Sequence, residues 1–267
     1  MKVTRAAHGL RLALAVAFLV WLCSAWLGAE PVPILPDAAE RIGRRLWENE
    51  SGGSVAGLTS WNAGEQFASL GIGHFIWYPR GRTGPFKESF PPLLRYFQAQ
   101  GVALPAWLAT AGGCPWPTRA AFLADRAGKR MEELRRLLAT HVGLQAQFAV
   151  DRLKAAVPAM LACVPPDQRE AVIRRFSSLA STAQGQYALV DYVNFKGEGT
   201  LATERYDGQG WGLLQVLERM SDDPPLEAFS RAADQVLTER VRHAPPERHE
   251  ERWLPGWRNR LATYQGG

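Results

Sequence analysis

The sequence predicts a mainly helical (α+β) domain with a small β-rich insertion after the first helix. From residue 87 onward, apolar residues recur at helical spacing, and the breaks between these segments carry Gly or Pro. Residues 51–85 differ, because they are rich in Gly, Ser, Thr and aromatic residues, a composition that favours short strands. We therefore expect one helical domain over residues 37–267.

The N-terminus has the features of a secretory leader. Lys2, Arg5 and Arg11 precede an apolar run over residues 12–22, and the small residues Ser24, Ala25, Gly28 and Ala29 follow. The run is shorter than the roughly 20 residues that cross a bilayer, which favours a cleavable signal peptide (1–29) over a retained anchor, the alternative. Residues 30–36, with three prolines, then form a spacer. We expect a periplasmic or secreted protein with no membrane span after cleavage of the leader.

Charge and composition narrow the class of partner. The chain carries 31 Lys and Arg and 26 Asp and Glu, a net charge of +5, and removal of the leader takes away three of the basic residues. The high pI thus partly reflects the leader, and we expect no nucleic-acid partner. A mildly basic surface suits an anionic polymer such as the cell wall. No paired metal-ligand motif is present, so neither a metal nor a cofactor is expected.

Two cysteines follow the leader, Cys114 and Cys163. In an exported chain they could form a disulfide, and two free thiols are the alternative. A peptidase pair of Cys114 with His74 is a further interpretation, but no local nucleophile signature supports it.

The first helix is expected over residues 37–49, with Asp37 as its cap and Ile42 and Leu46 on one face. The later helices are expected over residues 87–100, 118–141, 144–163, 166–183, 186–195, 210–220, 225–242 and 256–264.

Glu50 lies in line with the apolar face of that first helix, four residues beyond Leu46, where Ser51-Gly52-Gly53 end it. A carboxyl group at the edge of an apolar environment keeps its proton more readily, as the general acid of a glycosidase must. An exposed glutamate at a helix end is the alternative. Glu48 is a rival acid, but its position two residues away points it elsewhere.

The string Ser69-Leu70-Gly71-Ile72-Gly73-His74 carries the second pattern. Alternating glycines in an apolar strand let another backbone or a ligand approach one face. Ser69 offers a hydroxyl beside that face, and His74 a titratable ring.

Together, Glu50 and the Ser69–His74 string resemble phage-type lysozymes, and Glu50-Ser51 is similar to the Glu-Ser of lytic transglycosylases. The resemblance covers roughly residues 42–75. It implies a lysozyme-like fold, Glu50 as the acid, Ser69 as the substrate-side hydroxyl and His74 as a structurally placed histidine. Phage-type lysozymes also have an aspartate between the acid and the hydroxyl residue. Here that interval offers only Asn62 and Glu65, so either Glu65 is the second carboxylate or there is none.

Aromatic residues crowd the same segment, and their faces can stack on sugar rings. We expect one or two of them to reach a groove, the alternative for each being a core position; they are Trp61, Phe67, Phe75, Trp77 and Tyr78.

A second polar, glycine-rich region covers residues 191–199 and 206–215. We consider it as a further wall of the groove, with Asn194, Glu198 and Gln209 as candidates; a helix cap and a tight turn are the alternative. Residues 253–260 resemble loosely the basic, aromatic C-terminal helix of phage-type enzymes.

These patterns predict an exported enzyme that cleaves peptidoglycan, either a muramidase or a lytic transglycosylase, with Glu50 as general acid. A non-catalytic glycan-binding protein on the same scaffold is the alternative.

Overall fold

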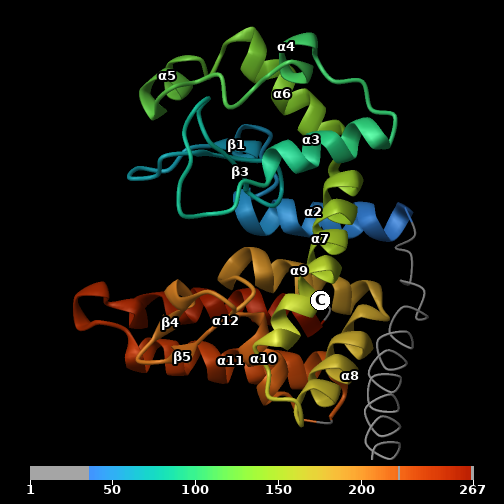
Figure 1. The fold of residues 1–267 in the computed structure, drawn as a ribbon, viewed down its shortest axis with the longest axis vertical. Coiled ribbons are helices and arrows are strands. Elements are labelled where there is room, and N and C mark those ends of the chain that lie inside the picture. The colour runs from blue at the N-terminus through green and yellow to red at the C-terminus, as the bar shows by residue number, and fades with distance from the viewer. Residues whose placement is uncertain (1–35, 222, 266–267) are drawn as a thin grey trace, which may run out of the picture. The chain divides into compact units, whose positions relative to one another are not determined.

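The computed structural model describes residues 36–221 and 223–265 (Figure 1). The chain divides into two units after Pro33, and the second, Ile34–Gly267, contains every described residue. The expected leader and most of the expected spacer lie outside the described residues and stay predictions.

The described part is mainly helical with a small antiparallel sheet after its first helix, which confirms the predicted fold class. Helix α2 (Pro36–Ser51) is followed by strands β1 (Thr59–Ser60), β2 (Ala68–Leu70) and β3 (Phe75–Trp77), in the order β1-β2-β3. Thr59 pairs with Leu70, and Ala68 pairs with Trp77.

Four helices follow the sheet: α3 (Phe90–Ala99), α4 (Ala106–Ala109), α5 (Arg119–Ala124) and α6 (Lys129–Thr140). The prediction of one helix over 118–141 is wrong, because a turn separates α5 from α6. In this turn the Gly128 amide donates to the Asp125 carbonyl at 2.8 Å. A Cβ at Gly128 would lie 1.6 Å from Asp125 Oδ1, so the Asp125 side chain packs against the backbone of this glycine.

Helix α7 (Val142–Ala162) packs closely against α2. A Cβ at Gly43 would lie 2.6 Å from Val142 Cγ1, so this glycine in α2 allows the approach. Figure 1 shows α7 running from the side of α2 that carries the sheet to the side that carries α8–α12.

The remaining helices are α8 (Arg169–Ala180), α9 (Ala183–Lys196), α10 (Leu213–Arg219), α11 (Pro225–His243) and α12 (Leu254–Ala262). Between α9 and α10, β4 (Arg205–Tyr206) and β5 (Gln209–Gly210) form a two-stranded hairpin. Its turn residues, Asp207 and Gly208, have φ of 48° and 79°, as a two-residue hairpin of type I′ requires. The tight turn considered for this region is therefore present.

No described helix is long and apolar enough to cross a membrane. Both described cysteines are free thiols: Cys114 is buried, and Cys163 is exposed at the end of α7. Burial raises the pKa of Cys114 to about 12, so its thiol is neutral and unsuited to nucleophilic attack. The disulfide and the peptidase pair are thus both unsupported.

Candidate active site

Glu50 lies in the last turn of α2, and its side chain is only 15% exposed. Its Oε1 accepts a hydrogen bond of 2.5 Å from Arg260 Nη2, and its Oε2 lies 3.5 Å from His74 Nδ1. The two partners come from α12 and from the turn after β2, far apart in the sequence. Glu50 is therefore a partly buried group at the junction of three segments, and the alternative of an exposed glutamate is excluded.

Arg260 is fixed by a second carboxylate, that of Asp191 in α9. Arg260 Nε donates to Asp191 Oδ2 at 2.7 Å, and Nη2 donates to Oδ1 at 2.9 Å, a two-pronged pairing. Burial acts to lower the pKa of Arg260, but the hydrogen bonds and charge of Asp191, with those of Glu50, outweigh it and raise that pKa. The guanidinium is thus a permanent cation in a set orientation against Glu50.

The Asp191 side chain is fully buried and is satisfied by further donors. Tyr264 Oη donates to Oδ2 at 2.7 Å, and Asn49 Nδ2 donates to Oδ1 at 3.0 Å. Asn49 Nδ2 also donates to Tyr187 Oη at 2.7 Å. A buried carboxylate is tolerated only with such compensation. We call the set Asn49, Tyr187, Asp191, Arg260 and Tyr264 the Asp191 network.

This network replaces the apolar surroundings that helical spacing suggested for Glu50. Ile42 and Leu46 are buried as expected, but the carboxyl group beyond them meets a guanidinium and an imidazole. A detectable signal was present: Tyr187 and Asp191, four residues apart, interrupt the apolar face of α9 with polar groups. Arg260 and Tyr264 show the same spacing at the C-terminus.

His74 completes the immediate surroundings of Glu50. It ends the turn between β2 and β3 with φ of 46°, a conformation that is uncommon for residues other than glycine. Its side chain is 35% exposed. Non-glycine residues with a positive φ occur frequently at functional sites.

The glycine string is a turn and not the expected strand interior. A Cβ at Gly71 would lie 2.2 Å from Gln145 Oε1, which accepts from the Ile72 amide at 3.1 Å. The bare face of this string therefore admits the Gln145 side chain of α7, a packing role rather than a ligand site.

Ser69 is buried in β2, where it pairs with Ser60 and Ile76. Its carbonyl accepts from Ser60 Oγ at 3.1 Å. The structure thus brings Glu50 and His74 within 3.5 Å of each other. Ser69 lies in the adjoining strand, and among the described residues its side chain forms no hydrogen bond with either of them.

Glu65, the candidate second carboxylate, lies in the loop between β1 and β2. Its Oε1 accepts from Asn62 Nδ2 at 3.2 Å, and its Oε2 is buried with no hydrogen-bond partner among the described residues. No recorded contact joins Glu65 or Asn62 to Glu50 in this part of the chain. Their assignment to catalysis and substrate binding stays a prediction that the observed contacts do not support.

The aromatic residues expected to stack on sugar are core residues. Trp77 is 1% exposed and packs on Phe90, and Trp61 is 5% exposed and packs on Phe122. Tyr78 is buried likewise. A buried ring has no free face for a ligand, so the proposed roles of Trp61, Trp77 and Tyr78 are corrected to packing.

Asn194 and Gln209, from the second polar region, are exposed. Asn194 lies in α9, three residues beyond Asp191, and Gln209 in β5 accepts from Arg219 Nη2 at 3.4 Å. Nearby, a Cβ at Gly212 would lie 2.1 Å from the Gly199 amide nitrogen. These two glycines therefore allow close backbone packing between the two segments.

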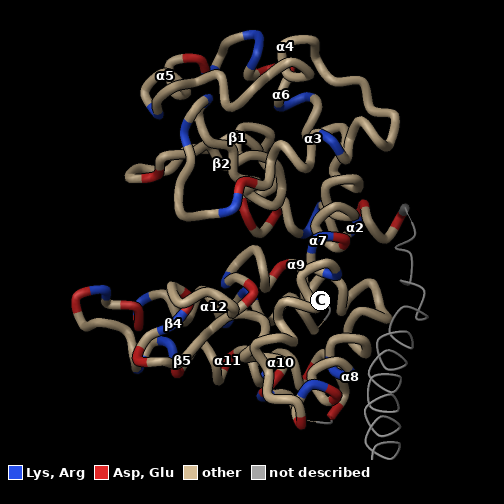
Figure 2. Tube along the Cα trace, viewed as in Figure 1, with Lys and Arg blue, Asp and Glu red and all other residues tan. Residues whose placement is uncertain are grey.

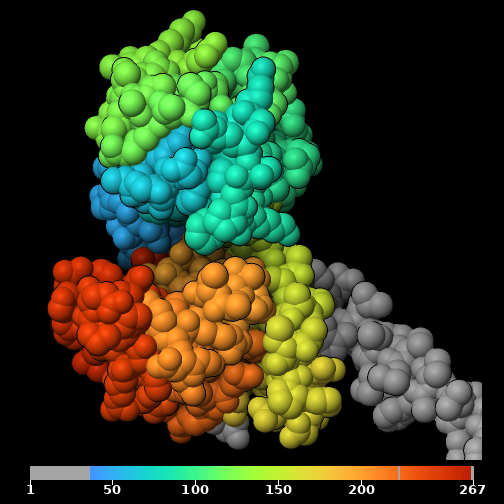
Figure 3. All heavy atoms as spheres, turned by 60° about the vertical axis from the view of Figure 1, so that its left-hand side comes forward, coloured from blue at the N-terminus to red at the C-terminus, as the bar shows by residue number. Residues whose placement is uncertain are grey.

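The bond between Glu50 and Arg260 joins helix α2 to helix α12. In Figure 3 the surface is indented between the segments coloured blue to teal and those coloured orange to red. Glu50 belongs to the first set and Arg260 to the second. The residues that the structure describes contain no cluster of three or more His, Cys, Asp or Glu side chains suited to a metal ion.

No family model, curated protein or solved structure matches this chain.

Proposed function

We propose that this protein is an exported glycosidase that cleaves peptidoglycan with Glu50 as its general acid. The observation that carries the proposal is the position of Glu50: a partly buried carboxyl at a helix end, oriented by Arg260 and bordered by His74. A general acid needs a fixed direction toward the glycosidic oxygen, which a guanidinium anchored to a buried aspartate supplies. The positive charge of that guanidinium opposes protonation of a neighbouring carboxyl group, which counts toward the second candidate below.

The same surroundings favour the lytic transglycosylase form of the reaction over the hydrolytic one. A hydrolytic enzyme needs a second carboxylate to activate water or to attack the sugar. Asp191 is fully buried and fully hydrogen-bonded, and Glu65 is bound to Asn62 in a loop. Glu50 therefore has no second free carboxylate in contact with it among the described residues.

In the proposed reaction, Glu50 gives its proton to the oxygen of the leaving sugar as the glycosidic bond breaks. A hydroxyl group of the remaining sugar then bonds to the anomeric carbon and returns its proton to the Glu50 carboxylate. The products are a shortened strand and an internally bridged sugar, and no water is consumed. His74 Nδ1, 3.5 Å from Oε2, borders the carboxyl group on the side away from Arg260 Nη2.

The test compares Glu50→Gln with Glu48→Gln on purified sacculi. Both remove one negative charge from the end of α2, but Glu48 is exposed. We expect Glu50→Gln to lower release of muropeptides at least about a hundredfold, because a general acid contributes that much. Glu48→Gln should retain activity. Undiminished cleavage by Glu50→Gln, or equal loss in both variants, would rule out the assignment.

The mass of the released fragments separates the two forms of the reaction, because hydrolysis adds one water to each cut and the internal transfer adds none.

A non-catalytic glycan-binding protein is the second candidate. The engagement of Glu50 Oε1 by Arg260 favours it, since that oxygen is already occupied. Binding to sacculi by the unaltered protein, without any release of fragments across a wide pH range, would support this candidate over the enzyme.

A further inference from the structure

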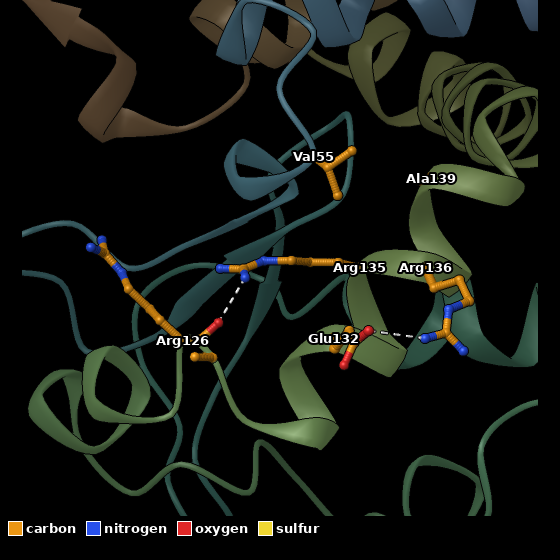
Figure 4. A pocket seen from close by; sticks show the side chains of 7 residues that line it. Val55, Arg126, Glu132, Arg135, Arg136 and Ala139 are labelled. Carbon is orange, nitrogen blue, oxygen red and sulfur yellow. Dashed lines mark hydrogen bonds and ion pairs between the residues drawn. The ribbon is translucent and has the colours of Figure 1, made fainter.

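A hollow of about 450 Å³ lies beside helix α6, outside the Glu50 site (Figure 4). Three arginines line it: Arg126 from the turn before α6, and Arg135 and Arg136 from α6. Glu132 is the single carboxylate in the lining, and Val55 with two alanines supplies an apolar part. The hollow therefore combines an excess of positive charge with an apolar surface.

Arg135 is held in one orientation across the hollow. Its Nε donates to the Thr59 hydroxyl at 2.8 Å, and its Nη1 donates to the Arg126 carbonyl at 2.8 Å. Figure 4 shows its side chain extended below Val55, with the guanidinium directed toward the Arg126 segment. Both partners are neutral groups, so the orientation is fixed without any compensation of the charge.

The charge of Arg135 is unbalanced. Within the described residues, no carboxylate lies within ion-pair distance of Arg135 or Arg126, whereas Glu132 is already bonded to Arg136 at 3.2 Å. Burial, and then the nearby charge of Arg126, lower the pKa of Arg135. A partly buried cation next to another cation is unfavourable, and an anion bound between them would relieve both penalties.

We propose that this hollow binds a carboxylate of a short peptide, with Arg126 and Arg135 as its charge partners. A guanidinium with two free N–H groups matches a planar carboxylate in geometry as well as charge. The apolar part of the lining, which includes Val55 at 48% exposure, suits the small side chains of such a peptide. The choice of polymer rests on the proposed function: the peptide stems of the cell wall carry free carboxylates.

The hollow is connected to the Glu50 site through the chain. Residues 51–58 run from the end of α2 to Val55 and then into β1, and Trp47 Nε1 donates to the Ser54 carbonyl at 2.9 Å, which ties this segment back to α2. The segment that lines the hollow at Val55 therefore begins directly after Glu50 and is tied to the same helix.

The test measures binding and not cleavage. The protein carrying Glu50→Gln is pelleted with sacculi that have intact peptide stems and with sacculi stripped of stems by an amidase. We expect Arg126→Gln to weaken binding to intact sacculi at least about fivefold, as for loss of a charge-assisted hydrogen bond. Binding to stripped sacculi should be weak in both proteins. Arg135→Gln should act in the same direction.

Arg95→Gln is the matched control, because Arg95 is an exposed arginine of α3 that does not line this hollow. Its affinity should change less than about twofold. Equal loss in Arg95→Gln, or unchanged binding by Arg126→Gln, would overturn the proposal. Binding that survives stem removal but disappears after removal of phosphate polymers would also overturn it.

This readout is independent of catalysis. If the unaltered protein cleaves nothing but Arg126→Gln binds less, the hollow stands and the proposed function fails. If the unaltered protein cleaves sacculi but intact and stripped sacculi are bound equally, the proposed function stands and the peptide site fails.

Discussion

Two regions of the molecule differ in how many of their arginines form ion pairs. Residues 51–141, which contain the sheet and α3–α6, carry ten Lys or Arg and five Asp or Glu. Within the described chain only Arg136 and Lys129 of these ten form ion pairs. Residues 163–265 carry 13 basic and 15 acidic residues, and most of their arginines contact a carboxylate. Figure 2 shows basic and acidic residues interspersed along this part of the chain.

The comparison separates arginines that support the fold from arginines that are available to a ligand. Arg260 and Arg240 are bonded to buried carboxylates, Asp191 and Glu250, and each holds several chain segments together. Arg126 and Arg135 line a hollow without such partners. Removal of the carboxylate partner of Arg260 or Arg240 should therefore destabilise the fold, whereas substitution of Arg126 or Arg135 should weaken binding of a ligand.

The largest stability effect is expected for Asp191→Asn. It removes the buried charge that fixes Arg260, and breaking such a pair on one side costs about 3 kcal/mol of unfolding free energy. Asp167→Asn, an exposed position, should change it by less than about 0.5 kcal/mol. Urea unfolding at neutral pH measures both. Similar stabilities for the two variants would contradict the structural role of the Asp191 network.

A second test of the comparison uses Glu250 and the pH dependence of the unfolding free energy. Its side chain is fully buried. Burial acts to raise its pKa, but hydrogen bonds from Arg240, Tyr206 and Arg248 outweigh burial and lower the pKa to about 2. Because the folded value lies below the unfolded one, the stabilisation is complete above about pH 4.5 and is lost as pH falls toward 2. We expect a loss of about 3 kcal/mol over this window.

Glu250→Gln should be less stable than the unaltered protein at neutral pH and should lack this part of the acid dependence. Glu251→Gln, at the exposed neighbouring position, should keep it. An identical acid profile in Glu250→Gln would show that other groups cause the loss.

A third test of the comparison concerns Lys196, whose buried amine lies against aromatic rings instead of a carboxylate. Its Nζ lies 3.4 Å from the centre of the Trp257 ring and 3.9 Å from that of Phe195. Burial, and then the charge of Arg240, lower its pKa to about 6. Between about pH 6 and 10.5 the unfolded chain binds more protons, so stability should rise with pH across this window.

Lys196→Met should flatten that rise, whereas Lys129→Met, at an exposed position, should not. The rings limit the effect because they favour the charged ammonium. Urea unfolding at pH 6, 8 and 10 measures the slope, and an unchanged slope in Lys196→Met would contradict the assignment.

The sequence by itself determined the fold class, most of the longer helices and the position of Glu50 at a helix end. Helical periodicity located α2, α7 and α11 closely, because their apolar faces repeat over several turns. The composition of residues 51–85 located the sheet, and the glycines after Glu50 placed that residue at the end of a helix. These are local properties of the chain, so sequence spacing carries them.

Only the tertiary structure decided which groups surround Glu50 and whether each aromatic residue lies in the core. Arg260 lies 210 residues from Glu50, and Asp191 joins them through a third helix. No local pattern encodes which polar groups meet when three helices pack. Trp77 could equally have faced a ligand, and packing against Phe90 placed it in the core. Contacts between distant segments depend on how the helices assemble, and spacing along one segment does not contain that information.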